Sequence, residues 1–379
     1  MAAVKFGTPG LNMPPPEANT EVCKTYEQAG LDFLVWFDQL NLTIPRSIWQ
    51  PDLVPGATLW DIDAWLEPWP MLTAAALATE RIELGLVASD TMRRAPAVLA
   101  QLALTIDHFA HGRFFLTLGA GERKQFEPYG LPRERPFAHL EEALKIVRLL
   151  WEHNEPVDYK GPIWNLDRAI LALPPFEGKP PKLLVAGGPG KALKFAGQLA
   201  DGWVSYWPAV GTVEDYAQQV RQLKRSAEEA GRDPDDVTVF LAFPSVIGPN
   251  DAAVTEATEN AALRWDAAAM LADTSCWTRA GMKNPLGDDW SYSRDLIPMW
   301  WTREDALKIV EQVPPEAVRA TRVTGTPAEA AAQIAPFIEA GATHVLVANY
   351  LPLIMSGDFS DALQGTSQSL ETIEILRQR

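Results

Sequence analysis

Three features of the sequence predict a parallel (β/α)₈ barrel with insertions. Short apolar runs recur along the chain and are continuous rather than alternating, which is typical of strands buried on both faces. Amphipathic stretches separate these runs, as expected of repeated βα units. The length of 379 residues suits one barrel with insertions, so we expect a single domain over residues 1–379. The eight predicted strands are Val4–Thr8, Phe33–Phe37, Ile82–Val87, Phe114–Leu118, Lys182–Ala186, Trp203–Ser205, Val237–Phe243 and His344–Ala348.

Proline, glycine and capping residues mark the ends of the predicted helices. Pro96 opens a helix that Gly112 closes before the next strand. Thr326 and Glu329 have the spacing of a capping box, and Gly341 is placed to end the helix that follows them.

Two segments, residues 39–68 and 250–320, are longer than barrel connections require. Segments of this length inside a compact domain are usually lids or binding segments. Many of the 14 tryptophans of the chain fall in these two insertions. We therefore expect the insertions to wall an apolar substrate pocket. The alternative is that they simply pack onto the barrel.

Charge and cysteine content exclude several classes of protein. There are 49 acidic and 33 basic side chains, a formal net charge of −16, so we expect no nucleic-acid partner. Cys23 and Cys276 lie far apart and are expected to be buried free thiols, which suits the cytoplasm. We expect no leader sequence. The longest apolar run, near residues 345–355, is interrupted by Asn349 and Pro352, so we expect no transmembrane segment.

Hydrolase and metal chemistry are not expected. The chain has no GxSxG, HExxH or CxxC motif. His108 and His111 are three residues apart at a predicted helix end, where a contact with the helix dipole explains them without a metal. His344 begins a strand and is expected at the structural end of the barrel.

Polar side chains follow several predicted strands, where barrel enzymes place their reacting groups. Glu122 follows the fourth strand, beside the flexible Gly119–Gly121 backbone, and could donate or accept a proton. Its alternative is an ion pair with Arg123 or Lys124 on an exposed loop. The other candidates at strand ends are Asp38, Gln39, Asn41, Ser89, Asp90, Arg93 and Arg94.

A glycine run follows the fifth strand and precedes an amphipathic stretch, 192–199. Gly187, Gly188 and Pro189 let the backbone approach a ligand closely, and the amides of a helix N-terminus favour an anion. We interpret the run as a site for a cofactor phosphate. An ordinary tight βα turn is the alternative.

These motifs together resemble the luciferase-like monooxygenase superfamily, and the resemblance covers nearly the whole chain. Within it, the sequence is similar to the branch that depends on coenzyme F420, a deazaflavin, and to ketoreductases of phthiodiolone-type lipids. The matching motifs, in order, are 37–41, 94–101, 112–122, 186–189, 200–203, 325–327 and 339–341. Those shared with the ketoreductases are 41–48, 67–69, 127–130 and 284–287.

The resemblance implies a bacterial-luciferase-like TIM barrel that holds F420 at the carboxyl ends of the strands, often as a homodimer. It implies that Gly187, Gly188 and Pro189 hold the phosphate of the coenzyme. Asp38 and Gly121 are expected beside the coenzyme. A non-prolyl cis peptide between Val87 and Ala88 is expected to form a bulge behind its ring.

The chain departs from the pattern of this branch at two positions. Gln39 stands where the branch usually has a histidine that hydrogen-bonds the substrate oxygen, and glutamine cannot titrate. Thr43 stands where a tryptophan is frequent. We expect Thr43, Arg93 and Trp69 to contact the substrate.

The sequence thus predicts an oxidoreductase that moves hydride between F420 and an apolar ketone or alcohol. Glu122 would supply the proton, while Gln39 and Asp38 would position the oxygen. One alternative is an FMN-dependent monooxygenase with a separate reductase. Another is a barrel that binds the coenzyme without catalysis.

Overall fold

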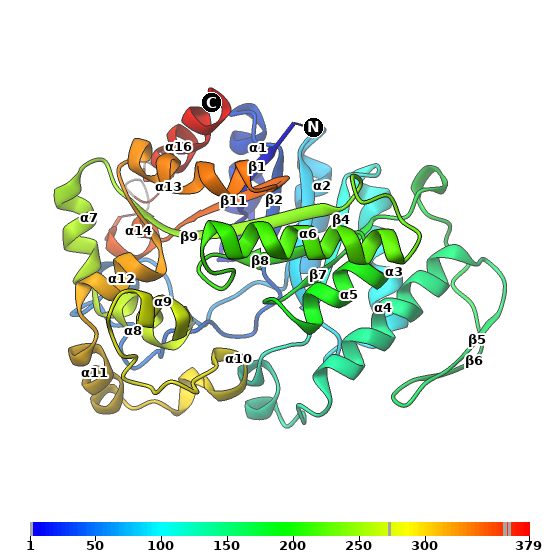
Figure 1. The fold of residues 1–379 in the computed structure, drawn as a ribbon, viewed down its shortest axis with the longest axis horizontal. Coiled ribbons are helices and arrows are strands. Elements are labelled where there is room, and N and C mark those ends of the chain that lie inside the picture. The colour runs from blue at the N-terminus through cyan, green and yellow to red at the C-terminus, as the bar shows by residue number, and fades with distance from the viewer. Residues whose placement is uncertain (1–2, 272–273, 359–361, 363–364) are drawn as a thin grey trace.

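The predicted barrel is present in the computed structural model, which describes residues 3–271, 274–358, 362 and 365–379. Eight parallel strands close on themselves in the order β1-β2-β3-β4-β7-β8-β9-β11, with β11 beside β1 (Figure 1). Each coincides with a predicted strand: β1 (Lys5–Pro9), β2 (Phe33–Trp36), β3 (Glu83–Asp90), β4 (Phe114–Gly119), β7 (Lys182–Ala186), β8 (Gly202–Tyr206), β9 (Thr238–Ile247) and β11 (His344–Asn349). A short β10 (Val323–Gly325) extends the sheet along the end of β9.

Helices wrap the outside of the barrel and bury their apolar faces against it (Figure 1). The predicted ends are confirmed for α3, which begins at Pro96 and ends at a left-handed His111, and for α13, where Thr326 and Glu329 form a capping box. The surrounding helices are α1 (Pro16–Gln28), α2 (Pro68–Ala78), α3 (Pro96–Ala110), α4 (Pro136–Glu152), α5 (Lys191–Leu199), α6 (Val213–Glu229), α13 (Pro327–Glu339) and α16 (Ser367–Arg377).

The interior of the barrel is filled unevenly along its axis. Near the strand starts, the rings of Phe33, Phe115 and Phe240 meet with centroids 5.1–6.4 Å apart. Gly7 and Gly85 make room for them, because a Cβ at either position would lie within 2.4 Å of the Phe33 or Phe115 ring. Toward the strand ends the interior side chains become small: Ala88, Ala186 and Ala242. Aromatic rings therefore fill the barrel near the strand starts, and small side chains line part of its wall near the carboxyl ends.

The two insertions pack against each other and share a hydrophobic core. Trp49, Trp265 and Trp277 are buried in this core, and Trp265 stacks edge-on to Trp301 at 4.8 Å. The insertions thus pack mainly against each other, and the expectation that they wall a substrate pocket stays a prediction. The first insertion contains η1 (Pro55–Thr58). The second contains α7 (Asp251–Thr258), α8 (Ala261–Ala269), α9 (Thr274–Arg279), α10 (Tyr292–Asp295), η5 (Pro298–Trp300), α11 (Arg303–Gln312) and α12 (Pro315–Thr321).

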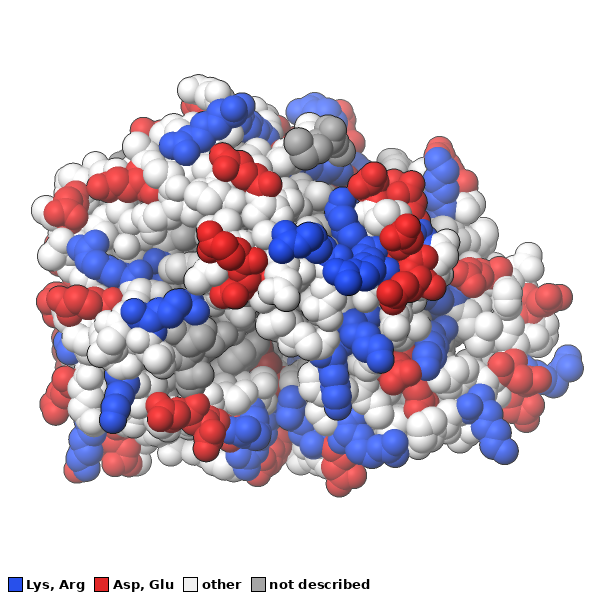
Figure 2. Space-filling model, viewed as in Figure 1, with Lys and Arg blue, Asp and Glu red and all other residues white. Residues whose placement is uncertain are grey.

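Smaller elements complete the chain. An antiparallel hairpin of β5 (Val157–Lys160) and β6 (Asn165–Ala169), which the sequence pattern did not predict, connects α4 to β7. Both cysteines are buried, as expected. Within the described part of the chain, no helix has the length and apolar character required to span a membrane. Acidic and basic side chains are interspersed over the face drawn in Figure 2. The remaining short elements are η2 (Arg123–Gln125), η3 (Glu127–Tyr129), η4 (Phe176–Gly178) and α14 (Leu351–Met355).

Candidate active site

The carboxyl ends of β2, β3 and β4 bring together most of the polar residues predicted from the sequence. Asp38 and Gln39 follow β2, Ser89 and Asp90 end β3, and Glu122 follows β4. These strands are neighbours in the barrel, so residues about 50 and 85 positions apart along the chain come into hydrogen-bonding contact.

Asp38 is the centre of a buried ionic network. Its carboxylate accepts a hydrogen bond of 2.6 Å from Ser89 Oγ, pairs with Arg93 Nη2 at 3.0 Å and also pairs with Arg94. Only 4% of Asp38 is exposed. Because Ser89 and two arginines hold this carboxylate, Asp38 is placed to orient the loop after β2.

Arg93, expected to contact the substrate, is part of the same network. Its guanidinium pairs with Asp90 and donates to the backbone carbonyl of Asp38 at 2.8 Å. Burial opposes the charge of Arg93, but the Asp38 and Asp90 carboxylates outweigh it and raise the pKa of the guanidinium. The side chain is therefore committed to these partners.

The other two expected substrate contacts are also engaged inside the protein. Thr43 Oγ1 donates to Asp266 of α8 at 2.7 Å, which ties the first insertion to the second. Trp69 is 4% exposed, and its ring packs 6.2 Å from that of Phe114, between α2 and the barrel. Neither side chain is included in the substrate site proposed below.

The peptide bond between Val87 and Ala88 is cis, as the resemblance implied. The pairing of β3 with β4 shifts register between Leu86 and Ser89, so a bulge marks this point of the barrel wall. The small Ala88, Gly119 and Ala186 lie together here, since a Cβ on Gly119 would sit 3.7–3.8 Å from the Cβ atoms of both alanines. This wall could lie against a planar ring.

Gly121 turns the chain after β4 with φ +78°, a conformation that favours glycine. A Cβ here would also lie 2.5 Å from the Phe126 ring. Arg133 Nε donates to the Gly121 carbonyl at 3.0 Å. The turn directs the chain into η2, which carries the next residues of the site.

Lys124 on η2 is a member of the site that the sequence did not single out. Its side chain is completely buried, and Nζ lies 2.9 Å from Glu122 Oε2 and 2.9 Å from the Asn41 carbonyl, and also contacts Gln39 Oε1. Burial lowers the pKa of Lys124, which Glu122 partly opposes. The sequence allowed a pair between Glu122 and Lys124 only on an exposed loop; a lysine in a short turn carries no signal of burial.

The glycine run after β7 forms an open loop at the start of α5. Gly190, at φ +104°, is the residue before the helix. Because glycine has no side chain, it cannot cap the first amides of α5. Cβ atoms added to Gly188 or Gly190 would meet nothing within 4 Å, whereas one on Gly187 would strike Ala192 at 2.6 Å. Trp203 Nε1 anchors the loop by donating to the Gly187 carbonyl at 2.8 Å. A helix start with free amides and open space beside it suits an anion such as a phosphate.

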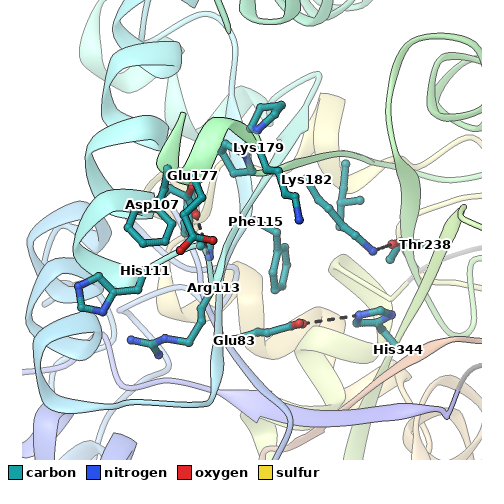
Figure 3. Close-up of a pocket in the computed structure, with 16 residues that line it drawn as sticks. Glu83, Asp107, His111, Arg113, Phe115, Glu177, Lys179, Lys182, Thr238 and His344 are labelled. Atoms are coloured by element: carbon teal, nitrogen blue, oxygen red, sulfur yellow. Dashed lines mark hydrogen bonds and ion pairs between the residues drawn. The ribbon is translucent and has the colours of Figure 1, made fainter. Parts of the chain in front are cut away.

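A cavity of about 370 Å³ opens at the opposite end of the barrel, around the strand starts. Figure 3 shows Glu83 and His344 facing each other there, and Lys182 directed to Thr238, which it reaches at 3.1 Å. Burial, together with Lys5 and Lys182, lowers the pKa of His344 to about 3. These groups lie next to the aromatic rings at the strand starts, as the position of His344 predicted. We assign no catalytic role to them.

Comparison with known proteins supports the same family. Residues 2–344 match the family described as luciferase-like monooxygenase. The chain is 34% identical over 316 residues to a phthiodiolone/phenolphthiodiolone dimycocerosates ketoreductase of Mycobacterium tuberculosis, covering 82% of each protein.

Two solved structures share the fold. An F420-dependent secondary alcohol dehydrogenase in complex with an F420-acetone adduct has a TM-score of 0.71 and 21% identity, with 99% of each chain covered. An FMN-bound type II Baeyer–Villiger monooxygenase of Pseudomonas putida has a TM-score of 0.64 and 18% identity, with 98% and 97% covered. On the family match and the 34% identity, the chain belongs to the luciferase-like monooxygenase family.

Proposed function

We propose that this enzyme is an F420-dependent oxidoreductase that transfers hydride between the coenzyme and an apolar ketone or alcohol. The observation that carries the proposal is the 34% identity, over 82% of the chain, to a protein named as a ketoreductase. The open Gly187–Gly190 loop and the small-residue wall at Ala88 and Ala186 fit the phosphate and the ring of such a coenzyme.

When bound, the deazaflavin would supply a hydride, which it carries as a two-electron donor. Gly187, Gly188 and Pro189 would hold its phosphate, and Val87 and Ala88 would support its ring. The hydride adds to the carbonyl carbon of the ketone while a proton adds to the oxygen, which yields the alcohol.

We assign the proton to Glu122 and the hydrogen bond to the substrate oxygen to Gln39. Glu122 follows β4 at the carboxyl end of the barrel, and its side chain is 22% exposed. Asp38, held by Ser89 and two arginines, acts by positioning the loop that carries Gln39. Gly121 allows the turn that brings Glu122 into place.

A second candidate is an FMN-dependent monooxygenase, because an FMN-bound monooxygenase shares the fold over nearly its whole length. Anaerobic titration with reduced F420 and with reduced FMN separates the two functions. We expect tight binding of F420 and single-turnover reduction of an apolar ketone. Oxygen-dependent turnover with FMN alone would support the second function, and coenzyme binding without turnover would indicate a non-catalytic barrel.

We also propose that the protein forms a homodimer through the outer faces of α2 and α3. Leu77 of α2 is 70% exposed, and Val98 and Phe109 of α3 are 46% and 42% exposed. Val98 and Phe109 are three helical turns apart and lie on one face of α3. Leu77 and Phe109 line one hollow between α2 and α3, and exposed apolar side chains on adjacent helices are typical of a protein–protein interface.

A further inference from the structure

The loop after β2 is held by two side chains of η2 that contact the same atom. Gln39 Oε1 accepts a hydrogen bond from Lys124 Nζ and another, of 2.8 Å, from Gln125 Nε2. Gln125 also accepts from the Leu40 amide at 2.7 Å and donates to the Asn41 carbonyl at 2.9 Å. Residues 39–41 are thus held by η2, the short helix that follows β4.

These bonds decide which way the Gln39 amide faces. A carbonyl oxygen has two lone pairs, and both are taken by Lys124 and Gln125. A flipped amide would place its NH₂ group against an ammonium and another NH₂ group, which is repulsive. Among the described residues, Gln39 Nε2 has no hydrogen-bond partner, and Gln39 is only half-buried at the barrel mouth.

Lys124 itself cannot reach a substrate. Its ammonium donates hydrogen bonds to Gln39 Oε1 and to the Asn41 carbonyl, and it forms an ion pair with Glu122 Oε2. The side chain is 0% exposed. A cation that is completely buried among these partners can act only through the groups it contacts.

We propose that Lys124 is a positioning residue that fixes the Gln39 amide as a permanent hydrogen-bond donor to the substrate oxygen. The pull of the ammonium on the amide oxygen polarises the amide and strengthens its N–H groups as donors. A histidine at this position could titrate between donor and acceptor. The clamped glutamine donates throughout the neutral range and favours substrates that present an acceptor, such as a ketone oxygen. This inference rests on the proposed function.

A double-mutant cycle tests whether Lys124 acts through Gln39. Lys124→Met keeps the length of the stem and removes the charge, and Gln39→Leu removes the amide. We expect Lys124→Met to lower kcat/KM for a ketone by roughly ten- to a hundredfold in the wild-type background, the size of one charge-assisted hydrogen bond. In the Gln39→Leu background the same change should cost several-fold less, since its interaction with Gln39 is already lost and only its contact with Glu122 remains. The proposal would be overturned if Lys124→Met lowered kcat/KM equally in both backgrounds. It would also be overturned if the effect of Lys124→Met depended on Glu122→Gln and not on Gln39→Leu.

Folding and coenzyme affinity are followed for each variant by thermal unfolding and calorimetry with F420. If Lys124→Met does not fold, Gln125→Leu removes the second donor to Gln39 and should give a smaller loss of kcat/KM that also vanishes in Gln39→Leu. A loss that persists in that background refutes the clamp.

A measurement without substrate keeps this inference separate from the proposed function. Donation to an amide oxygen strengthens the partial double bond of the amide, so rotation about its C–N bond slows. We expect the ¹⁵N-labelled side-chain amide of Gln39, assigned by its loss in Gln39→Leu, to rotate faster in Lys124→Met than in the wild type. Unchanged rotation of the Gln39 amide would refute the proposed role of Lys124. If the rotation becomes faster as expected but the enzyme shows no F420-dependent turnover, only the proposed function is refuted.

Discussion

Replacing Gly188 by aspartate tests the assignment of a phosphate to the loop after β7. A Cβ on Gly188 meets nothing within 4 Å, so the variant should fold without a clash. An acidic side chain near the start of α5 is also compatible with the helix dipole. The substitution therefore adds a negative charge to the place proposed for an anion, with little cost to stability.

The expected loss of affinity follows from the charge. Two unit charges on the order of 5 Å apart, at an effective dielectric constant of about 20, repel by about 3 kcal/mol, which is roughly a hundredfold in Kd. The repulsion falls at high salt, because exposed charges are screened.

Gly188→Asn is the matched control, since it has the same shape without the charge. Calorimetric titration with F420 should show a loss of about a hundredfold for aspartate and a few-fold loss for asparagine. Equal affinities of the aspartate and asparagine variants, in folded protein, would show that no anion binds at this loop.

Three further predictions concern catalysis, pH and assembly. Glu122→Gln removes the proposed proton donor and should lower the single-turnover rate of hydride transfer by roughly a hundred- to ten-thousandfold, with F420 affinity little changed; a rate within a few-fold of wild type would exclude this role. Since the pKa of His344 falls from 6.5 in the unfolded chain to about 3 in the fold, the unfolded state binds the proton more tightly, and stability is lost as pH falls below 6.5. Urea unfolding should show about 2 kcal/mol of this loss between pH 6.5 and 5, and His344→Phe should remove it; an identical pH profile in both proteins would contradict the assignment. Leu77→Glu combined with Phe109→Glu should convert the dimer into a monomer by light scattering, with Leu131→Glu, at an exposed position on another face, as a control; a monomeric wild type would refute the interface.

The barrel could be predicted because its signals are local. Continuous apolar runs mark strands buried on both faces, and residues such as Pro96, Thr326 and Glu329 mark helix ends through hydrogen bonds to near neighbours. The strand ends then place Asp38 and Glu122 at one mouth, because parallel strands end on the same side. The hairpin of β5 and β6 was missed, since most of its residues are exposed and carry no apolar pattern.

The hydrogen-bond partners of the site residues could not be predicted from any local sequence pattern. Whether Lys124 is solvated or buried depends on the Asn41 carbonyl and Gln39, which lie 83 and 85 residues away in sequence and meet it only when β2, β3 and β4 stand side by side. The composition of the insertions likewise does not say which tryptophans meet, and only the folded structure brings Trp265 against Trp301. Side-chain burial and hydrogen-bond pairing are set by packing between distant segments, and one segment of sequence does not contain that information.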